Sequence, residues 1–212
     1  MQLEIIPAIL VKTREELVER IEKVKPHVKT VQIDIMDNEF VPNKTIGLES
    51  LKNLPKGIDY EFHWMVQFPE YWIKMIKGNH LHIVHLESLM SWDNVRWAIR
   101  ESGGRLGIAI NPETSVEEAY KFEKEVKYIL VMTVRPGFDG QKYIQEMEEK
   151  VEKLRKRYPD FDIEVDGGIN AETISRAVKA GANKLVAASA IFSKPDAEKA
   201  IAELRKKAGA VL

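Results

Sequence analysis

The chain has 212 residues, 44% of them hydrophobic, which fits one sizeable folded domain over residues 1–212. Its 32 basic and 33 acidic residues give a net charge of -1, so a global field that attracts nucleic acid or an anionic membrane is excluded. Cysteine is absent, which excludes disulfides and thiolate metal ligands. The N-terminus lacks a signal-peptide pattern, and no run approaches the roughly 18 apolar residues of a membrane span. We therefore expect a cytoplasmic protein that binds neither nucleic acid nor membrane.

Short apolar runs rich in β-branched residues recur along the chain and are interpreted as strands. They cover Leu3–Leu10, Val28–Met36, Ile58–Val66, Leu81–Leu86, Leu106–Ile110, Tyr128–Val134, Phe161–Val165 and Lys184–Ala188. Segments with helical spacing of apolar residues lie between most of them, at Thr13–Lys25, Ser91–Ser102, Ser115–Lys124, Gln141–Tyr158, Ala171–Ala180 and Asp196–Ala208. This alternation predicts an α/β fold with a parallel sheet, and eight units allow closure into a single (β/α)8 TIM barrel. An open doubly wound sheet is the alternative.

Local signals support these boundaries. Thr13 precedes Glu16 at the spacing of a capping box, Asn170 can cap the helix that follows it, and Gly181 comes directly after that helix. The longest irregular stretch, Asp37–Gly57, is expected to hold a short helix around Leu48–Leu54.

Polar residues stand near the C-terminal ends of several expected strands, where barrels of this kind carry their active sites. Gln32 and Asp34 are two apart and share one face of the second strand, while His63 and Asp166 end the third and seventh. Two carboxylates, an imidazole and an amide at one mouth suit proton removal next to a ketone, with a second carboxylate returning a proton from the opposite face and a divalent cation holding the enediolate. The competing interpretation is that each carboxylate pairs with a cation or caps a helix.

Turns of small residues follow three strands, at Arg135–Gly140, Asp166–Gly168 and Ala187–Ser189. The loops after strands seven and eight are the frequent phosphate site of barrels, although tight turns need glycine whatever they bind. Three methionines, Met36, Met65 and Met132, share one level near strand ends, where they either line the site or fill the core. His85, at the end of the fourth strand, is interpreted as a residue behind the site or on its rim.

The stretches IIPAIL, IDIMDNEFVPN, FHWMVQFPE, HLES, GIAINPET, VMTVRPGFDGQ, VDGGIN and GANKLVAASAIF resemble, in order and over nearly the whole chain, the ribulose-phosphate 3-epimerase family. The resemblance implies an isomerase with a TIM-barrel fold that interconverts D-ribulose 5-phosphate and D-xylulose 5-phosphate in the pentose phosphate pathway. It also implies a divalent metal (Zn, Fe, Mn or Co), a sugar-phosphate substrate and a homo-oligomer.

Carried over by position, the resemblance implies that Asp34 accepts the proton and Asp166 donates one, both also binding the metal. His63 is a third metal ligand, and Gln32 stands where the family has a histidine ligand. The resemblance places substrate contacts at Ala8, Met36, His63, Met65, Met132, Gly137, Phe138, Asp139, Gly140, Gly167, Gly168, Ala188 and Ser189.

Four departures from the family pattern fall around this site. The amide of Gln32 is a poorer zinc donor than imidazole, which predicts weaker binding and a preference for a harder metal such as manganese. Asp139 adds a negative charge to the phosphate-side loop, and Arg135 can offset that charge. Ala8 lacks the hydroxyl of the serine usual in the family, and Ala188 adds a methyl group where the family has glycine. Two alternatives therefore stay open, an epimerase for a related ketose phosphate such as D-allulose 6-phosphate and a non-catalytic sugar-phosphate-binding barrel.

Overall fold

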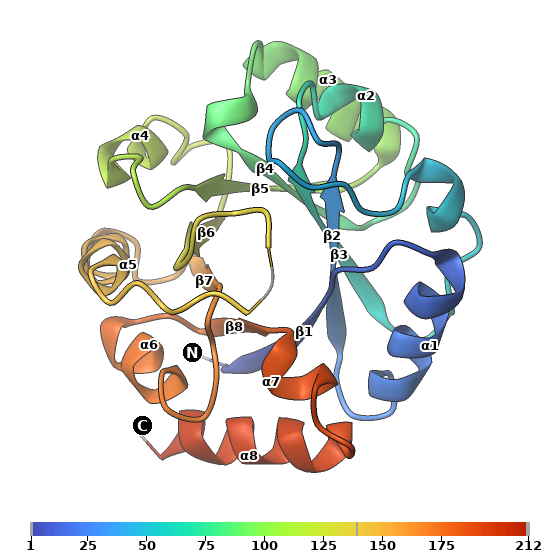
Figure 1. Cartoon of the computed structure of the whole chain (residues 1–212). Helices are drawn as coiled ribbons and strands as arrows, with labels where there is room; N and C mark the ends of the chain where they lie inside the picture. The colour runs from blue at the N-terminus through green and yellow to red at the C-terminus, as the bar shows by residue number, and fades with distance from the viewer. Residues whose placement is uncertain (1, 139, 211–212) are drawn as a thin grey trace.

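The computed structural model describes residues 2–138 and 140–210. Within these ranges, eight parallel strands close into a barrel in sequence order, with the last strand paired to the first (Figure 1). The strands are β1 (Glu4–Ile9), β2 (Thr30–Met36), β3 (Asp59–Met65), β4 (Leu81–His85), β5 (Arg105–Ile110), β6 (Tyr128–Met132), β7 (Asp162–Asp166) and β8 (Lys184–Ala187). The closed order confirms the predicted barrel and excludes the open doubly wound sheet.

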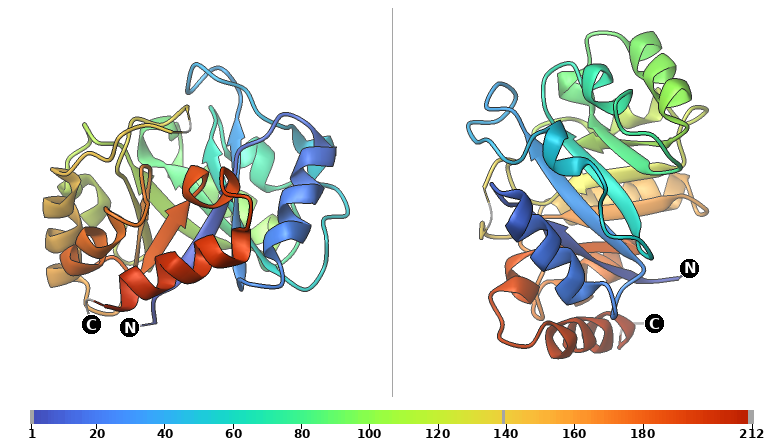
Figure 2. Two further views of the ribbon diagram at one scale, coloured as in Figure 1. Left: turned by 60° about the horizontal axis from the view of Figure 1, so that its bottom comes forward. Right: turned by 90° about the vertical axis from the view of Figure 1, so that its right-hand side faces the viewer.

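Helices surround the barrel and cover the outer face of its strands (Figures 1 and 2). They are α1 (Arg14–Val24), α2 (Glu70–Ile73), α3 (Trp92–Ser102), α4 (Val116–Tyr120), α5 (Met147–Arg157), α6 (Ile174–Ala180), α7 (Ser189–Phe192) and α8 (Ala197–Gly209). Two 3-10 helices, η1 (Leu48–Leu51) and η2 (Leu86–Ser88), lie in loops, and η1 confirms the short helix expected there.

The predicted start of α6 was wrong. The helix begins at Ile174 rather than Ala171, and residues 171–173 form a turn before it. The side-chain Oδ1 of Asn170 accepts hydrogen bonds from the backbone N–H groups of Glu172 and Thr173, at 2.8 and 3.2 Å. These are the bonds expected of a capping residue, and the backbone N–H of Ile174 donates to the carbonyl of Asn170 at 3.0 Å, so Asn170 caps the turn through which the chain enters α6. The predicted end was right, since Gly181 stands directly after the helix with φ +114°.

The predicted start of α5 was also wrong, by six residues. The helix begins at Met147, whereas the apolar spacing predicted a helix from Gln141. The side-chain amide of Gln141 donates to the backbone carbonyls of Arg135 and Phe138, at 2.6 and 2.9 Å. Those bonds hold Gln141 in the loop after β6, so the chain enters the helix later.

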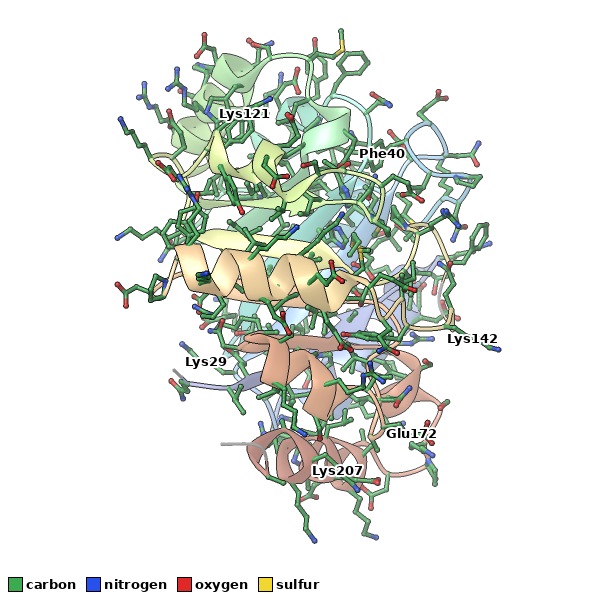
Figure 3. All side chains as sticks on the ribbon, turned by 90° about the vertical axis from the view of Figure 1, so that its left-hand side faces the viewer. Lys29, Phe40, Lys121, Lys142, Glu172 and Lys207 are labelled. Carbon is green, nitrogen blue, oxygen red and sulfur yellow. The ribbon has the colours of Figure 1, made fainter. Side chains whose placement is uncertain are left out.

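Apolar side chains fill the space between strands and helices, as the near-continuous apolar strands predicted. Ile33, Ile35 and Trp64 belong to this outer core and are fully buried. Charged residues such as Lys29, Lys121 and Lys207 point outward from the surface (Figure 3). Because side chains alternate along a strand, the inner face of the barrel carries a different set, with apolar clusters beside buried polar groups.

A buried acidic pair lies inside the barrel, two residues before His63 on β3 and two before Asp166 on β7. The hydroxyl of Tyr128 is 2.6 Å from Oε2 of Glu164 and 3.2 Å from Oε2 of Glu61. Burial raises the pKa of Glu61 to about 7, and burial together with the charge of Glu61 raises the pKa of Glu164 well above its usual range. At least one of these carboxyl groups therefore holds a proton at neutral pH.

Replacing Glu61 with Gln should make stability less dependent on pH. The folded protein keeps a proton on Glu61 that the unfolded chain releases above pH 4.5, so the free energy of unfolding falls as pH rises from about 4.5 to 7. Glu61→Gln should therefore stabilise the protein at pH 8 more than at pH 5, by up to about 3 kcal/mol at 1.4 kcal/mol per pKa unit.

Urea unfolding at the two pH values measures this difference, with Glu152→Gln on the exposed face of α5 as the charge-matched control. An equal effect of Glu61→Gln at both pH values would contradict the prediction.

Candidate active site

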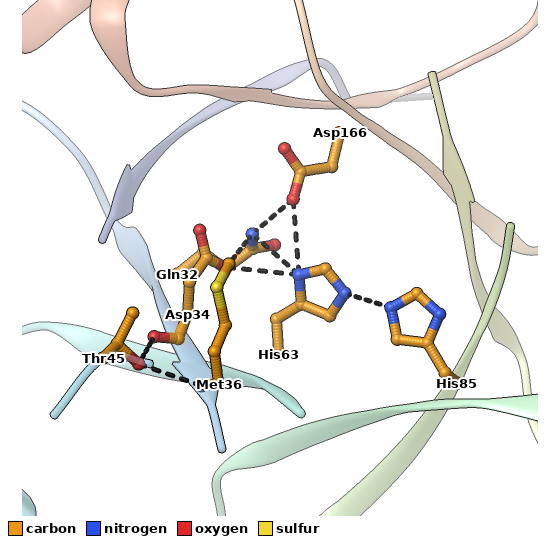
Figure 4. A network of polar contacts seen from close by, with 7 residues as sticks. All are labelled: Gln32, Asp34, Met36, Thr45, His63, His85 and Asp166. Carbon is orange, nitrogen blue, oxygen red and sulfur yellow. Dashed lines mark hydrogen bonds and ion pairs between the residues drawn. The ribbon is translucent and has the colours of Figure 1, made fainter. Parts of the chain in front are cut away.

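Two carboxylates from separate strands meet at one imidazole in the barrel interior (Figure 4). Asp34 and His63 are register partners on β2 and β3, and the Oδ1 of Asp34 lies 3.2 Å from the Nδ1 of His63. The Oδ2 of Asp166, from the end of β7, lies 3.3 Å from the same nitrogen. Asp34 is 5% exposed and His63 is fully buried. The structure thus brings together Asp34, His63 and Asp166, which the sequence predicted to meet at one end of the barrel.

The side chain of Gln32 bridges the two carboxylates. Its Nε2 donates to the Oδ1 of Asp34 at 2.8 Å and to the Oδ2 of Asp166 at 2.7 Å. Its Oε1 is buried and has no hydrogen-bond partner among the described residues. A half turn of the amide would exchange the two atoms and place the oxygen between two carboxylate oxygens, which is favourable only if a cation lies between them.

This donor set fits a divalent cation. One ligand atom from each of Asp34, His63 and Asp166 can be chosen so that all three lie within 4.8 Å of one another. The unpartnered Oε1 of Gln32 can supply a fourth after the half turn. Two carboxylates, one imidazole and one amide oxygen form a harder set than two carboxylates and two imidazoles.

Burial and mutual charge set the protonation of the cluster. Burial, assisted by the charge of Asp166, raises the pKa of Asp34 despite hydrogen bonds from His63 and Gln32. Burial alone would lower the pKa of His63, but the hydrogen bonds and charges of Asp166 and Asp34 outweigh it and raise that pKa to about 9. Without a cation, His63 therefore carries a proton on Nδ1 between the carboxylates, and a metal must displace that proton to bind there.

A cavity opens directly above the cluster and is lined by Asp34, Asp166 and most of the predicted substrate contacts. The predicted residues on its wall are Ala8, Met36, Met65, Met132, Gly137, Phe138, Gly140, Gly167, Gly168, Ala188 and Ser189. His63 is not on the wall and lies beneath it. Sequence reasoning missed Leu10, Val134, Pro136, Gln141, Ile169 and Val186, whose apolar or loop character carried no separate signal.

The turn after β7 needs glycine at two positions. Gly167 and Gly168 have φ of +117° and +67°, and a Cβ on Gly168 would lie 2.6 Å from the backbone nitrogen of Tyr143. A Cβ on Gly167 would lie 2.3 Å from the side chain of Val134. The turn therefore packs directly against the chain that follows β6. The helix α7 begins close by, at Ser189, so the predicted phosphate-side segments lie along one side of the cavity.

Contacts from the β2–β3 loop position the end of β2. The hydroxyl of Thr45 donates to the carbonyl of Asp34 at 2.8 Å and accepts from the backbone N–H of Met36 at 2.9 Å (Figure 4). Asn43 donates from Nδ2 to the carbonyl of Gly137 at 2.7 Å, which joins this loop to the loop after β6. Sequence reasoning missed Thr45 and Asn43, because both roles depend on loop conformation.

Two further predictions have mixed outcomes. Asp139 lies outside the described residues, while the proposed compensating Arg135 pairs its Nε with Glu113 at 2.6 Å. His85 does lie behind the predicted site, but it is fully buried inside the barrel rather than on a rim. Its Nε2 is 2.8 Å from the Nε2 of His63.

No helix within residues 2–138 and 140–210 is long and apolar enough to cross a membrane.

Comparisons with known proteins identify the family of the chain. A family model described as "Ribulose-phosphate 3 epimerase family" matches residues 4–192. The chain belongs to this family. It is 42% identical over 184 residues to the cytoplasmic isoform of ribulose-phosphate 3-epimerase from Oryza sativa subsp. japonica, covering 83% of this chain and 81% of that protein. It is 36% identical to the Bacillus subtilis ribulose-phosphate 3-epimerase, over 82% and 85% of the two chains.

Membership in the ribulose-phosphate 3-epimerase family identifies the chain as an isomerase of the epimerase class that acts on a sugar phosphate. Similar solved structures agree on the fold. A 3-hexulose-6-phosphate synthase superposes with a TM-score of 0.71 at 20% identity, covering 97% of this chain and 99% of its own. The protein titled KGPDC from Streptococcus mutans gives 0.76 at 12% identity, over 100% and 99% of the chains.

Replacing Gln32 with His should make this protein bind zinc in preference to manganese. Imidazole is a better donor to zinc than an amide oxygen, so the affinity for Zn²⁺ should rise relative to Mn²⁺ by about tenfold or more. Calorimetric titration of metal-stripped protein with each ion measures the ratio.

Gln32→Asn is the matched control, because it keeps the amide but shortens the side chain, and it should weaken both ions. No gain in zinc affinity from Gln32→His would place residue 32 outside the metal shell.

Proposed function

We propose that this protein epimerises D-ribulose 5-phosphate to D-xylulose 5-phosphate at carbon 3, by proton transfer between Asp34 and Asp166. The observation that carries the proposal is the convergence of these two carboxylates, from strands β2 and β7, on the Nδ1 of His63 at 3.2 and 3.3 Å. Inversion at one carbon needs an acid and a base on opposite faces of the substrate. Two carboxylates on the wall of one cavity supply that pair.

Asp34 is assigned the role of proton acceptor. Its raised pKa suits a group that removes a weakly acidic proton, because a carboxylate of higher pKa is the stronger base. The hydroxyl of Thr45 fixes the strand backbone on both sides of residue 35, which holds the Asp34 side chain in place.

Asp166 is assigned the role of donor to the opposite face. It ends β7 immediately before the Gly167–Gly168 turn, at the side of the cavity where we place the phosphate. The three methionines keep the reacting carbon in apolar surroundings, where proton transfer between side chains competes less with water.

A divalent cation held by Asp34, His63 and Asp166, with Gln32 as fourth donor, would supply stabilisation of the negative charge that develops on the substrate oxygens. Manganese or another hard divalent ion is the proposed occupant, because Gln32 offers oxygen.

Ala8 and Ala188 favour a second candidate substrate. Both line the cavity, where the family pattern has a hydroxyl and a smaller residue, so both departures alter the surface that meets the sugar phosphate. A related ketose phosphate such as D-allulose 6-phosphate is therefore the runner-up.

The direct test is NMR of D-ribulose 5-phosphate in D2O with metal-stripped protein, followed by addition of Mn²⁺ or Zn²⁺. We expect deuterium at carbon 3 and formation of xylulose 5-phosphate after the metal is added. The same experiment with D-allulose 6-phosphate compares the two substrates. Faster turnover of the allulose compound would overturn the pentose assignment, and exchange on neither would contradict epimerisation of both sugars.

The two carboxylates can be separated by substitution. Asp34→Asn and Asp166→Asn should each lower epimerisation by at least about 100-fold, the usual contribution of an acid or base. Asp166→Asn should still exchange the carbon-3 proton of ribulose 5-phosphate without inversion, since the base on that face remains. Asp34→Asn should instead exchange only the proton of xylulose 5-phosphate.

Asp160→Asn, at an exposed turn before β7, is the control. Circular dichroism checks folding of each variant. Near-normal turnover in either Asp34→Asn or Asp166→Asn would show that the replaced residue is not the proposed acid or base.

A further inference from the structure

A second histidine lies directly behind His63, on its side away from the carboxylates. His85 ends β4 and is fully buried. The two Nε2 atoms are 2.8 Å apart, and the ring planes are inclined by 21° (Figure 4). A hydrogen bond between two ring nitrogens needs a proton on one and a lone pair on the other. The direction of this bond therefore decides which nitrogen of His63 is free on its other side.

Glu87, at the far end of this series of hydrogen bonds, decides which of the two histidines donates. Its Oε2 lies 3.3 Å from the Nδ1 of His85. Although burial raises its pKa, hydrogen bonds from His85, the Thr114 side chain and the Asn111 backbone lower it to about 2, so the group is a carboxylate and accepts only. His85 must then carry its proton on Nδ1, which leaves its Nε2 to accept from the Nε2–H of His63.

The carboxylate of Glu87 is itself held in one orientation. Its Oε1 accepts from the backbone N–H of Asn111 at 2.8 Å and from the hydroxyl of Thr114. Lys150 on α5 donates to the carbonyls of Asn111, at 3.0 Å, and Thr114, at 2.5 Å, so the loop after β5 is tied down on both sides. Only Oε2 is then left for His85.

We propose that His85 and Glu87 are positioning residues that hold a proton on the Nε2 of His63, so that the proton on Nδ1 is the one a cation displaces. The Nδ1 of His63 is thereby the atom offered to the cation that the two aspartates bind. The inference rests on the proposed metal-assisted function and extends it from the four ligands to the residues behind them. Partners of this kind orient a ligand imidazole and typically contribute 10- to 100-fold to metal affinity.

Glu87→Gln reverses this chain of hydrogen bonds while preserving shape. The two donors from Asn111 and Thr114 retain the amide oxygen, so the amide NH2 faces the Nδ1 of His85. His85 then carries its proton on Nε2 and donates to His63, whose Nε2 now accepts. The only proton left on His63 is the one on Nδ1, so a metal can no longer displace it without reversing the bond to His85. His85→Phe removes the partner without imposing a direction, so its effect on metal binding should be smaller.

Two measurements test the proposal. Titration of metal-stripped protein with Co²⁺, followed by its visible absorption, should show affinity about 10- to 100-fold lower in Glu87→Gln than in the parent. Two-bond ¹H–¹⁵N NMR of the imidazoles should show His85 protonated on Nδ1 in the parent and on Nε2 in Glu87→Gln. Glu117→Gln removes an exposed carboxylate on the nearby α4 and should change neither reading.

The outcomes separate this proposal from the epimerase assignment. Unchanged Co²⁺ affinity in Glu87→Gln, or a parent with His85 protonated on Nε2, overturns the positioning role even if the parent turns over substrate. Weaker Co²⁺ binding with the expected imidazole shift supports the role, and if the parent then epimerises no ketose phosphate, the proposed reaction alone fails.

Discussion

The structure depends on placing two negatively charged carboxylates close together in the interior of a barrel. Like charges in a region of low polarisability repel strongly, and each also loses its hydration. Here Asp34 and Asp166 share two donors, the Nε2 of Gln32 and the Nδ1 of His63, which lie between them at 2.7 to 3.3 Å. Those donors occupy the position in which a cation would neutralise the pair. The contacts of Thr45 and His85 keep the four groups in register.

Much of this arrangement could be predicted from local sequence because a strand repeats every two residues. That period placed Gln32 and Asp34 on one face, and the alternation of strands with helices predicted the closed barrel that brings β2 and β7 to a common interior. The helix starts could not be predicted equally well. Gln141 was expected in the first turn of a helix, but its side chain bonds to the backbone carbonyls of Arg135 and Phe138 and holds a loop.

The position of His85 shows where local patterns stop being informative. Its contact with His63 depends on the pairing of β3 with β4, in which His63 is opposite Ile83 and His85 lies two residues further along β4. Asn111 and Thr114 reach Glu87 only because the β5–α4 loop folds back over η2. These are contacts between separate elements, and no spacing in the sequence encodes them. The proposed ligands lie on regular strands. Of the groups that orient them, His85 ends β4, Glu87 lies in the short helix η2 and Thr45 lies in the β2–β3 loop.

The fold by itself does not select this chemistry, since a 3-hexulose-6-phosphate synthase shares the barrel at 20% identity. The proposed chemistry of this chain depends on its four central groups, and Gln32 is the informative one. An amide presents a donor or an acceptor after a half turn of one bond, without gaining or losing a proton. Gln32 can therefore bridge the carboxylates when no cation is there and offer oxygen when one is. An imidazole at position 32 would have to release a proton before the same nitrogen could change from donor to metal ligand. With glutamine at this position, the pH dependence of metal binding comes from His63 and the carboxylates.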